Sequence, residues 1–318
     1  VISEENFFEP LKDVFSFFKL KGSWGMMGND NITAYQYLSM YSFNTDSYYA
    51  FGKTPVSVQS IYETVTANPL VTWETAKTWN IGFSSQFLNG KLGLDLDYFQ
   101  SNRNDILITR NASIPTYSGL SLPAENLGKV KNHGFEAIAT YRDSKGDFEW
   151  GVTGNVTYAK NEVVYADEAA DTPAWQRETG HPIDGGTYYK ALGIYQTQEQ
   201  IESTPHLSGT KIGDLIYQDT NKDGNITWDD AVRRDKSATP KWIFGLTLNG
   251  SWKGMDVNAF FQGQADAEIL VQPTMNMATD FYEGRWSESN TAEQNAAAKW
   301  PRAFMKASSV AVSYTHLR

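Results

Sequence analysis

One short stretch of the 318-residue chain has the residue types and spacing of a calcium-binding loop. Residues 219–230 fit the pattern D-x-[DN]-x-[DN]-G with an acid at the twelfth position. Calcium takes roughly six to eight hard oxygen ligands in a flexible shell. Gly224 permits the sharp turn, and Asn225 and Thr227 are expected to contribute a carbonyl and a bridging water. The predicted metal ligands are Asp219, Asn221, Asp223, Asn225, Thr227 and Asp230.

Two readings of this loop stay open. Asp at position twelve is shorter than the usual Glu, so closure of the shell by Asp230 is less certain. The alternative is a solvated Asn/Asp/Gly turn that binds nothing. The preceding residues 212–218 look extended and residues 228–234 allow one short helix, so the flanking helices of an EF-hand are not expected. Any bound Ca²⁺ would therefore be a structural staple within a long connection.

The remaining chemistry-bearing residues do not indicate an enzyme. The chain has no cysteine and four scattered histidines, and it lacks a P-loop, a G-x-G-x-x-G and a G-x-S-x-G motif. Carboxylates are plentiful, so a glycosidase pair is possible, but nothing singles one pair out. The net charge is 27 − 37 = −10 and basic blocks are missing, which argues against nucleic acid as a partner.

The dominant pattern along the chain has period two, which is typical of β-strands. In residues 92–98, Leu, Leu, Leu and Tyr fall on one side and Gly, Asp and Asp on the other. Helical spacing is weaker, and its best candidate is residues 286–300. About eight such strands are expected. The clearest are residues 18–24, 79–87, 92–98, 135–141, 150–158, 242–252 and 255–262.

Short and long connections alternate between these predicted strands. Tight turns are expected at residues 88–91, 143–147 and 252–255. Long connections are expected at about residues 102–131, at 160–239 and from 263 onward. In an up-and-down meander, alternate links lie at opposite ends of the sheet. One end then carries tight turns and the other long loops, as in outer-membrane barrels.

The two predicted strand faces differ in composition, and aromatic rings gather near the strand ends. Rings at both ends match the girdles of a membrane barrel, although each ring taken singly could be a sandwich-core residue. These rings are Trp79, Tyr98, Phe99, Tyr141, Trp150, Tyr158, Trp242 and Trp252. The second face is small and polar, which suits a wet, plugged lumen. It comprises Asp95, Asp97, Thr153, Asn155, Thr157, Thr247, Asn249, Asp256, Asn258 and Gln262.

These patterns predict an all-β fold, an antiparallel up-and-down transmembrane β-barrel portion with long extracellular loops. Eight strands would close a barrel just wide enough for side chains, so the long loops favour an incomplete piece of a wider barrel. No apolar run reaches the ~18 residues of a membrane helix, and residues 1–5 do not resemble a signal peptide. We expect one partial barrel over residues 1–318, with the long loop 160–239 carrying the calcium-like motif.

Five stretches, in order, resemble the SusC/RagA-type TonB-linked outer-membrane proteins. Residues 20–29 resemble the family's "LKLRGSYGxTGN" strand, and residues 68–83 its "NPxLxWExxxxxNIGxD" stretch. Residues 98–107 are similar to "YxxxTxDLL", and residues 114–136 to "NxGxxxNxGxE". Residues 213–263 resemble the "GDxxYxDxNxDGxI" segment and the "FFQG" strand after it. The likeness covers about nine-tenths of the chain.

The resemblance implies a TonB-dependent transporter of a Gram-negative, Bacteroidetes-like outer membrane. Such a protein has a 22-stranded barrel and an N-terminal plug. It imports glycans or peptides with a SusD-type surface lipoprotein, draws energy through the TonB complex and contacts outer-membrane lipid. The chain departs from the family at both ends: we expect the plug and the TonB-contacting part to be absent, and residues 314–318 look foreign.

The resemblance assigns no substrate residue. Loop aromatics are candidates for stacking on sugar rings, although packing within the loops is the commoner role. They are Tyr117, Trp175, Tyr188, Tyr189 and Tyr282. The alternative from another class is a secreted soluble β-sandwich that binds carbohydrate and is stapled by calcium. A glycoside hydrolase fragment is a third possibility.

Overall fold

The computed structural model describes residues 1–32, 34–44, 60–110, 122–269 and 278–303. The chain divides into two compact units. Unit 1 comprises Val1–Asp171 and Pro240–Asp266, and unit 2 comprises Thr172–Thr239 and Ala267–Arg318. We describe each unit by itself.

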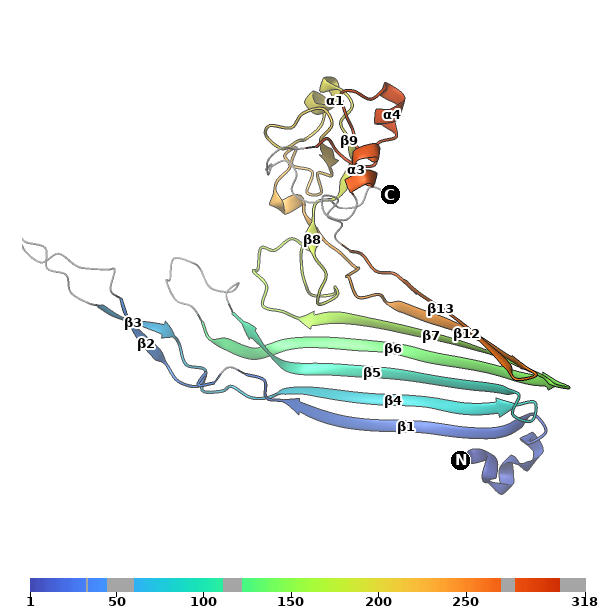
Figure 1. The fold of residues 1–318 in the computed structure, drawn as a ribbon. Helices are drawn as coiled ribbons and strands as arrows, with labels where there is room; N and C mark the ends of the chain where they lie inside the picture. Colours follow the sequence, from blue (N-terminus) through green and yellow to red (C-terminus); the bar gives the residue numbers. More distant parts are fainter. Residues whose placement is uncertain (33, 45–59, 111–121, 270–277, 304–318) are drawn as a thin grey trace, which may run out of the picture. The chain divides into compact units, whose positions relative to one another are not determined.

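Unit 1 is built on a seven-stranded antiparallel sheet whose order is β1-β4-β5-β6-β7-β12-β13 (Figure 1). Each strand pairs with the next one in the chain, apart from insertions, so the topology is an up-and-down meander. Its strands are β1 (Phe15–Asn29), β4 (Glu74–Phe87), β5 (Leu92–Thr109), β6 (Ala124–Lys145), β7 (Phe148–Tyr165), β12 (Trp242–Trp252) and β13 (Met255–Ala265). The alternating pattern predicted all seven.

Tight turns join the strands at one end of the sheet, as the sequence predicts (Figure 1). Residues 88–91 link β4 to β5, residues 146–147 link β6 to β7, and residues 253–254 link β12 to β13. In the last turn Lys253 and Gly254 have φ of 48° and 82°. Two successive positive φ values match the twist of paired strands, which is why the Lys-Gly pair closes this hairpin in two residues.

The other end of the sheet carries the longer connections. A hairpin of β2 (Met40–Asn44) and β3 (Ser60–Val65) lies between β1 and β4 in the chain. The connection expected at residues 102–131 is shorter than predicted, because β5 runs to Thr109 and β6 starts at Ala124. These strands continue beyond their apolar pattern, since backbone pairing does not require apolar side chains. Within the described residues the large sheet has seven strands, against the roughly eight expected.

Unit 2 has a small core of its own. It contains two short strand pairs, β8 (Thr187–Tyr188) with β11 (Val232–Arg233) and β9 (Ala191–Ile194) with β10 (Leu215–Tyr217). The buried core comprises Tyr189, Ile194, Leu215, Tyr217, Ile226 and Trp286. Asp214 is 1% exposed and pairs with Arg302 at 2.6 Å, so its buried charge has a partner.

The helices of unit 2 are short. Helix α1 (Gln198–Ser203) starts with a capping box between Thr197 and Gln200. The helix expected over residues 286–300 is reduced to α4 (Ala292–Ala296), and α3 (Ala278–Gly284) precedes it. Trp286 belongs to the buried core instead, so the helix does not extend back to it.

Candidate functional site

The pairing register of unit 1 aligns apolar rows from all seven strands on one side of the sheet, here called the apolar face. One row runs Leu20, Phe83, Leu96, Ala137, Val156, Phe244 and Gly263. The next row runs Phe18, Ser85, Leu94, Ala139, Gly154, Leu246 and Phe261. The single hydroxyl in these rows, on Ser85, donates to the Leu94 carbonyl at 3.2 Å and is 2% exposed.

This face is not covered as a sandwich core would be. Leu246 and Leu248 are each 39% exposed, and Leu20 and Phe261 more than half. Within the described residues, the other sheets have two strands each. An exposed apolar surface of this extent marks an interaction site for lipid or protein.

Aromatic rings lie in register near both ends of the apolar face. At the end with the long connections, the Trp79 ring lies 5.4 Å from Tyr98, and the Tyr158 ring 4.7 Å from Trp242. At the turn end, the Tyr141 ring lies 5.2 Å from Trp150. Rings at both ends of an apolar band match the girdles at the two membrane–water interfaces.

Phe99 does not belong to these girdles, so its predicted place is wrong. It follows Tyr98 directly, and neighbouring side chains in a strand point to opposite faces. Phe99 pairs with Gly134, and a Cβ on that glycine would lie 2.8 Å from the Phe99 ring. The aromatic side chain therefore covers a glycine on the opposite side of the sheet.

That opposite side, here called the polar face, carries the small polar residues expected there. Ser84, Asp95, Asn155 and Gln262 lie in one row with Lys19, Ile138 and Gly245. Another row brings together Thr140, Thr153, Thr247 and Phe260. All ten residues predicted for the second face share this side, because their positions in the strands have the same parity.

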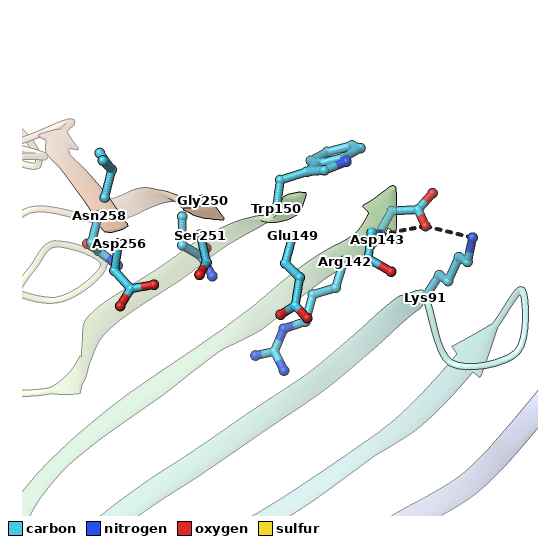
Figure 2. A pocket seen from close by; sticks show the side chains of 12 residues that line it. Lys91, Arg142, Asp143, Glu149, Trp150, Gly250, Ser251, Asp256 and Asn258 are labelled. Carbon is cyan, nitrogen blue, oxygen red and sulfur yellow. Dashed lines mark hydrogen bonds and ion pairs between the residues drawn. The ribbon is translucent and has the colours of Figure 1, made fainter. Parts of the chain in front are cut away.

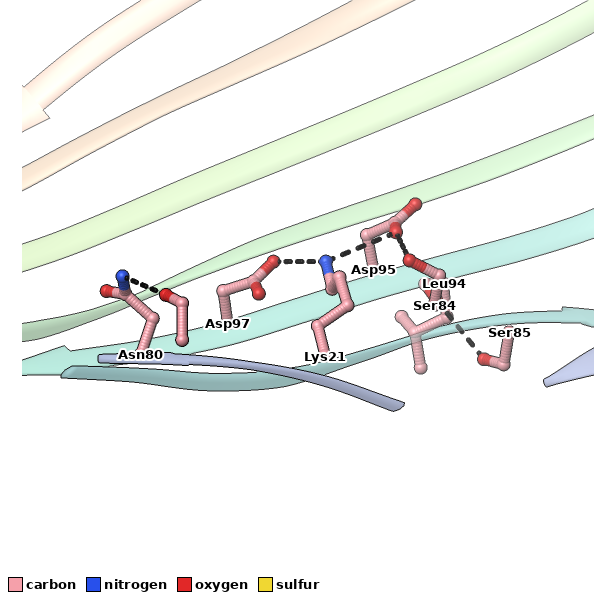
Figure 3. A network of polar contacts seen from close by, with 8 residues as sticks. Lys21, Asn80, Ser84, Ser85, Leu94, Asp95 and Asp97 are labelled. Carbon is pink, nitrogen blue, oxygen red and sulfur yellow. Dashed lines mark hydrogen bonds and ion pairs between the residues drawn. The ribbon is translucent and has the colours of Figure 1, made fainter. Parts of the chain in front are cut away.

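A charged network crosses three strands of the polar face (Figure 3). Lys21 of β1 donates to Asp97 of β5 at 2.5 Å and lies 3.8 Å from Asp95. Ser84 of β4, between them, donates to Asp95. The Lys21 side chain passes over Gly82, where a Cβ would lie 2.2 Å from the Asp97 carboxylate. Glycine at this position is what allows the ion pair to span two strand spacings.

A hollow at the turn end of the sheet collects further polar groups (Figure 2). Arg142 and Glu149 extend to the same side of the ribbon there. Lys91 pairs with Asp143 at 2.7 Å, and this hydrogen bond raises the pKa of the Lys91 amine. The hollow is open and polar, as expected for a surface that faces water or a polar protein segment.

In unit 2, the calcium-like loop is held by its own backbone. The carboxylate of Asp219 accepts the amides of Lys222 and Gly224, at 2.7 and 2.9 Å. Asp230 is fully buried, and its two oxygens accept the amides of Thr220 and Thr227 at 2.8 Å each and that of Asn221 at 3.3 Å. These five bonds close the loop around two carboxylates, one near its start and one at its end.

The predicted ligands are not all directed at one point. In the described part of the chain, no three His, Asp or Glu side chains lie close enough to hold a metal ion. Asn221 and Asp223 bond to each other instead, at 3.0 Å. The surroundings agree with the prediction: residues 215–217 form β10, and a single 3₁₀ turn, η4 (Trp228–Asp230), ends the loop. Calcium binding by this loop therefore stays a prediction.

The loop aromatics have different environments. Tyr189 is buried against Tyr217, with ring centroids 5.2 Å apart, and burial raises the pKa of its hydroxyl. Trp175 donates from its indole to the Asp229 carbonyl at 2.8 Å. Tyr282 is 68% exposed, and the Arg285 guanidinium lies 3.9 Å from its ring centroid. Tyr188 is half-buried in β8, and Tyr117 lies outside the described residues.

Trp228 is a further exposed ring that the sequence analysis did not single out. It is 56% exposed and contacts Tyr189 edge-on at 6.0 Å. It follows Thr227 within the calcium-like loop, a motif that is defined by its oxygen ligands and not by aromatic residues.

These features define the class of protein. No helix among the described residues is long and apolar enough to cross a membrane. A meandering antiparallel sheet with one apolar face, one polar face, ringed ends and turns at one end is a portion of an outer-membrane barrel wall. The chain belongs to the TonB dependent receptor-like β-barrel family, whose model matches residues 17–274. The proteins of this family are transporters of the Gram-negative outer membrane and are not enzymes.

Individual relatives agree with this assignment. The chain is 27% identical over 279 residues to TonB-dependent receptor P26 of Formosa agariphila. The alignment covers 84% of this chain and 27% of that protein. It is 26% identical over 305 residues to TonB-dependent receptor SusC of Bacteroides thetaiotaomicron, with coverage of 94% and 30%. The alternative of a soluble β-sandwich is wrong, because family and fold both place these strands in a barrel wall.

Solved structures share the fold. The RagAB peptide transporter superposes with a TM-score of 0.64 at 20% identity, covering 92% of this chain and 32% of that one. The RagAB peptide importer in its open-open state superposes with a TM-score of 0.62 at 19% identity, and the match covers 89% of this chain and 28% of that one. The chain thus spans between 27% and 32% of the length of these relatives.

Proposed function

We propose that this chain forms part of the barrel wall and external loops of a TonB-dependent importer of nutrient oligomers, glycans or peptides. The importer works in the outer membrane of a Bacteroidetes-like bacterium. Its partners are a SusD-type surface lipoprotein, the TonB complex, which engages a part of the receptor outside this chain, and outer-membrane lipid. Support comes from SusC and the RagAB peptide transporter among the similar proteins.

The observation that carries the proposal is the size of the apolar face. Trp242 and Trp252 end the 11-residue strand β12, with Phe244, Leu246 and Leu248 between them on the same side. Ten steps of ~3.3 Å make about 33 Å along the strand, and a tilt of ~40° reduces this to about 25 Å. The outward apolar band of outer-membrane barrels is ~25 Å tall.

The two ends then have different roles. The turn end faces the periplasm and the end with long connections faces outward, as in outer-membrane barrels. Exposed rings of unit 2, Tyr282 and Trp228, offer surfaces that suit stacking on sugar rings or on peptide side chains. The polar face lines the lumen, where polar side chains contact water and the plug.

The function is tested by deleting the full-length receptor from its host. We expect growth to fail on one class of oligomer, oligosaccharide or peptide, and to continue on the corresponding monomers, because monomers pass through general porins. Deleting the gene of the partner lipoprotein should give the same selectivity. Normal growth of the receptor deletion on every oligomer tested would contradict the proposal.

We also propose that residues 219–230 bind Ca²⁺ as a structural staple. The hydrogen bonds to Asp219 leave each of its oxygens a second lone pair, and both it and Asp223 are solvent-accessible. Calorimetric titration of the full receptor should show Ca²⁺ binding that Asp223→Ala removes. Asp229→Ala, next to the loop's last ligand, is the matched control and should retain it. Identical heats from wild type and Asp223→Ala would remove the claim.

A further inference from the structure

The chain before β1 differs from every other described connection at the turn end. Before Phe15, residues 2–11 form two 3₁₀ helices, η1 (Ile2–Glu4) and η2 (Asn6–Leu11). The turns at residues 88–91, 146–147 and 253–254 hold four, two and two residues. In Figure 1 this segment lies beside the turn end of β1.

Phe8 attaches the segment to the apolar face of the sheet. Its side chain is 5% exposed, stacks on Phe18 at 5.9 Å with an interplanar angle of 11°, and meets Phe15 edge-on at 5.9 Å. A register shift between Phe15 and Phe17 brings Phe15 and Phe18 to the same face, although three positions separate them. Phe15 in turn contacts Phe87 at 4.7 Å. The segment therefore lies over the side of the sheet that carries the apolar rows.

The segment also exposes apolar side chains. Phe7 is 72% exposed, Val14 56% and Leu11 48%. These positions are spaced by four and three residues, and charged residues lie between them. Glu9 and Lys12 pair with each other at 2.6 Å. Apolar side chains exposed next to a lipid-facing surface suit the boundary between lipid headgroups and acyl chains.

We propose that residues 2–14 form an interfacial anchor, with Phe7, Leu11 and Val14 inserted among the lipid acyl chains of the periplasmic leaflet. This inference rests on the proposed barrel, since it places the segment on the lipid side by continuity with the apolar face. The segment has four acidic residues and one lysine, which disfavours anionic headgroups. The partner is therefore a zwitterionic lipid surface, bound through apolar insertion.

The experiment uses site-directed spin labels in the full receptor, reconstituted into phosphatidylethanolamine–phosphatidylcholine vesicles. These 318 residues contain no cysteine, so a Cys introduced there is unique in this stretch. Any cysteine elsewhere in the receptor is replaced by serine. Phe7→Cys is the test, and Glu9→Cys is its matched control, because both positions are largely exposed and lie two residues apart. Leu246→Cys and Thr247→Cys report on the two faces of the wall.

For each label we measure the ratio of its collision rate with oxygen to its collision rate with a polar nickel complex. Oxygen concentrates among acyl chains, so we expect this ratio at position 7 to be roughly threefold or more above the ratio at position 9. Equal ratios at positions 7 and 9 would overturn the anchor. Protection of position 7 from both oxygen and the nickel complex would also overturn the anchor, because it would mean that protein covers this position. The strand labels separate the two ideas. If positions 246 and 247 also gave equal ratios, the barrel proposal itself would fail.

Discussion

At the residue scale, Asp230 shows how a motif position can have a second role. The calcium pattern assigns it to the last ligand of the shell, whereas the structure buries it fully with three backbone amides on its oxygens. A charged acceptor that satisfies several buried donors is strongly stabilising, because removing it leaves each donor without a partner. Asp230 holds the loop closed whether or not a metal binds.

Replacing Asp230 should therefore open the loop. We expect Asp230→Ala to destabilise unit 2 by about 2–4 kcal/mol, since three amides lose a charged acceptor. Hydrogen exchange at the amides of Thr220 and Thr227 should become roughly a hundredfold faster in the full receptor, since ~1.4 kcal/mol corresponds to a factor of ten. Asp229→Ala, exposed and adjacent, should leave both rates unchanged. Unchanged rates in Asp230→Ala would refute this role.

At the element scale, Gly82 determines how strands β1, β4 and β5 are tied together on the polar face. Lys21 reaches Asp97 across the backbone of β4, and only a residue without a side chain leaves that path open. The same strand region carries the Ser84–Asp95 bond. The three strands are thus cross-linked by side chains as well as by their backbone ladder.

We expect Gly82→Ala to weaken the wall at this point. The new Cβ would meet the Asp97 carboxylate and the Leu96 carbonyl oxygen at 2.2 and 2.3 Å, so the ion pair must break or the strands must shift. Overpacking of this kind costs about 1–3 kcal/mol. The urea midpoint of the folded, unboiled band of the full receptor should fall. Gly22→Ala, one strand away with no atom within 4 Å of its Cβ position, is the control and should not change it.

At the scale of the whole molecule, the difference between the two faces decides where the protein sits. The apolar face continues over seven strands, while the other face carries small polar and charged groups with a few apolar side chains such as Ile138 and Phe260. In water such a sheet would need a second layer to cover the apolar rows. In a bilayer the lipid covers them, and the strand edges are closed by further strands of the barrel.

Placing an arginine on the apolar face or on the polar face should have different effects on assembly, because one face contacts lipid and the other faces the lumen. We expect Leu246→Arg to cost about 2–4 kcal/mol, because it places a charge near the middle of the lipid-facing band. The adjacent Thr247→Arg, on the lumen face, should assemble normally. The measurement is the fraction of full receptor that migrates as a compact band in unboiled detergent samples. Equal assembly of the two variants would count against lipid on the apolar face.

Much of the seven-stranded sheet could be predicted from the sequence, because the alternation of side chains between the two faces of a strand is a local property. Alternation in residues 92–98 and 242–252 sets which side chains share a face, and the turn residues set where each hairpin closes. Parity also shows that Tyr98 and Phe99 cannot both be girdle rings, a point that counting along the strand could have found. The family resemblance was carried by motifs of the same local kind.

Other features were decided only by tertiary contacts, which no local pattern encodes. The burial of Tyr189 against Tyr217 depends on segments that meet in unit 2. The passage of Lys21 over Gly82 needs three strands in register, and the seating of Phe8 needs a β-bulge that brings Phe15 and Phe18 to one face. The sequence by itself determined that there is an apolar side and a polar side. The tertiary structure decided which side chains reach across them, because such contacts join residues distant in the chain.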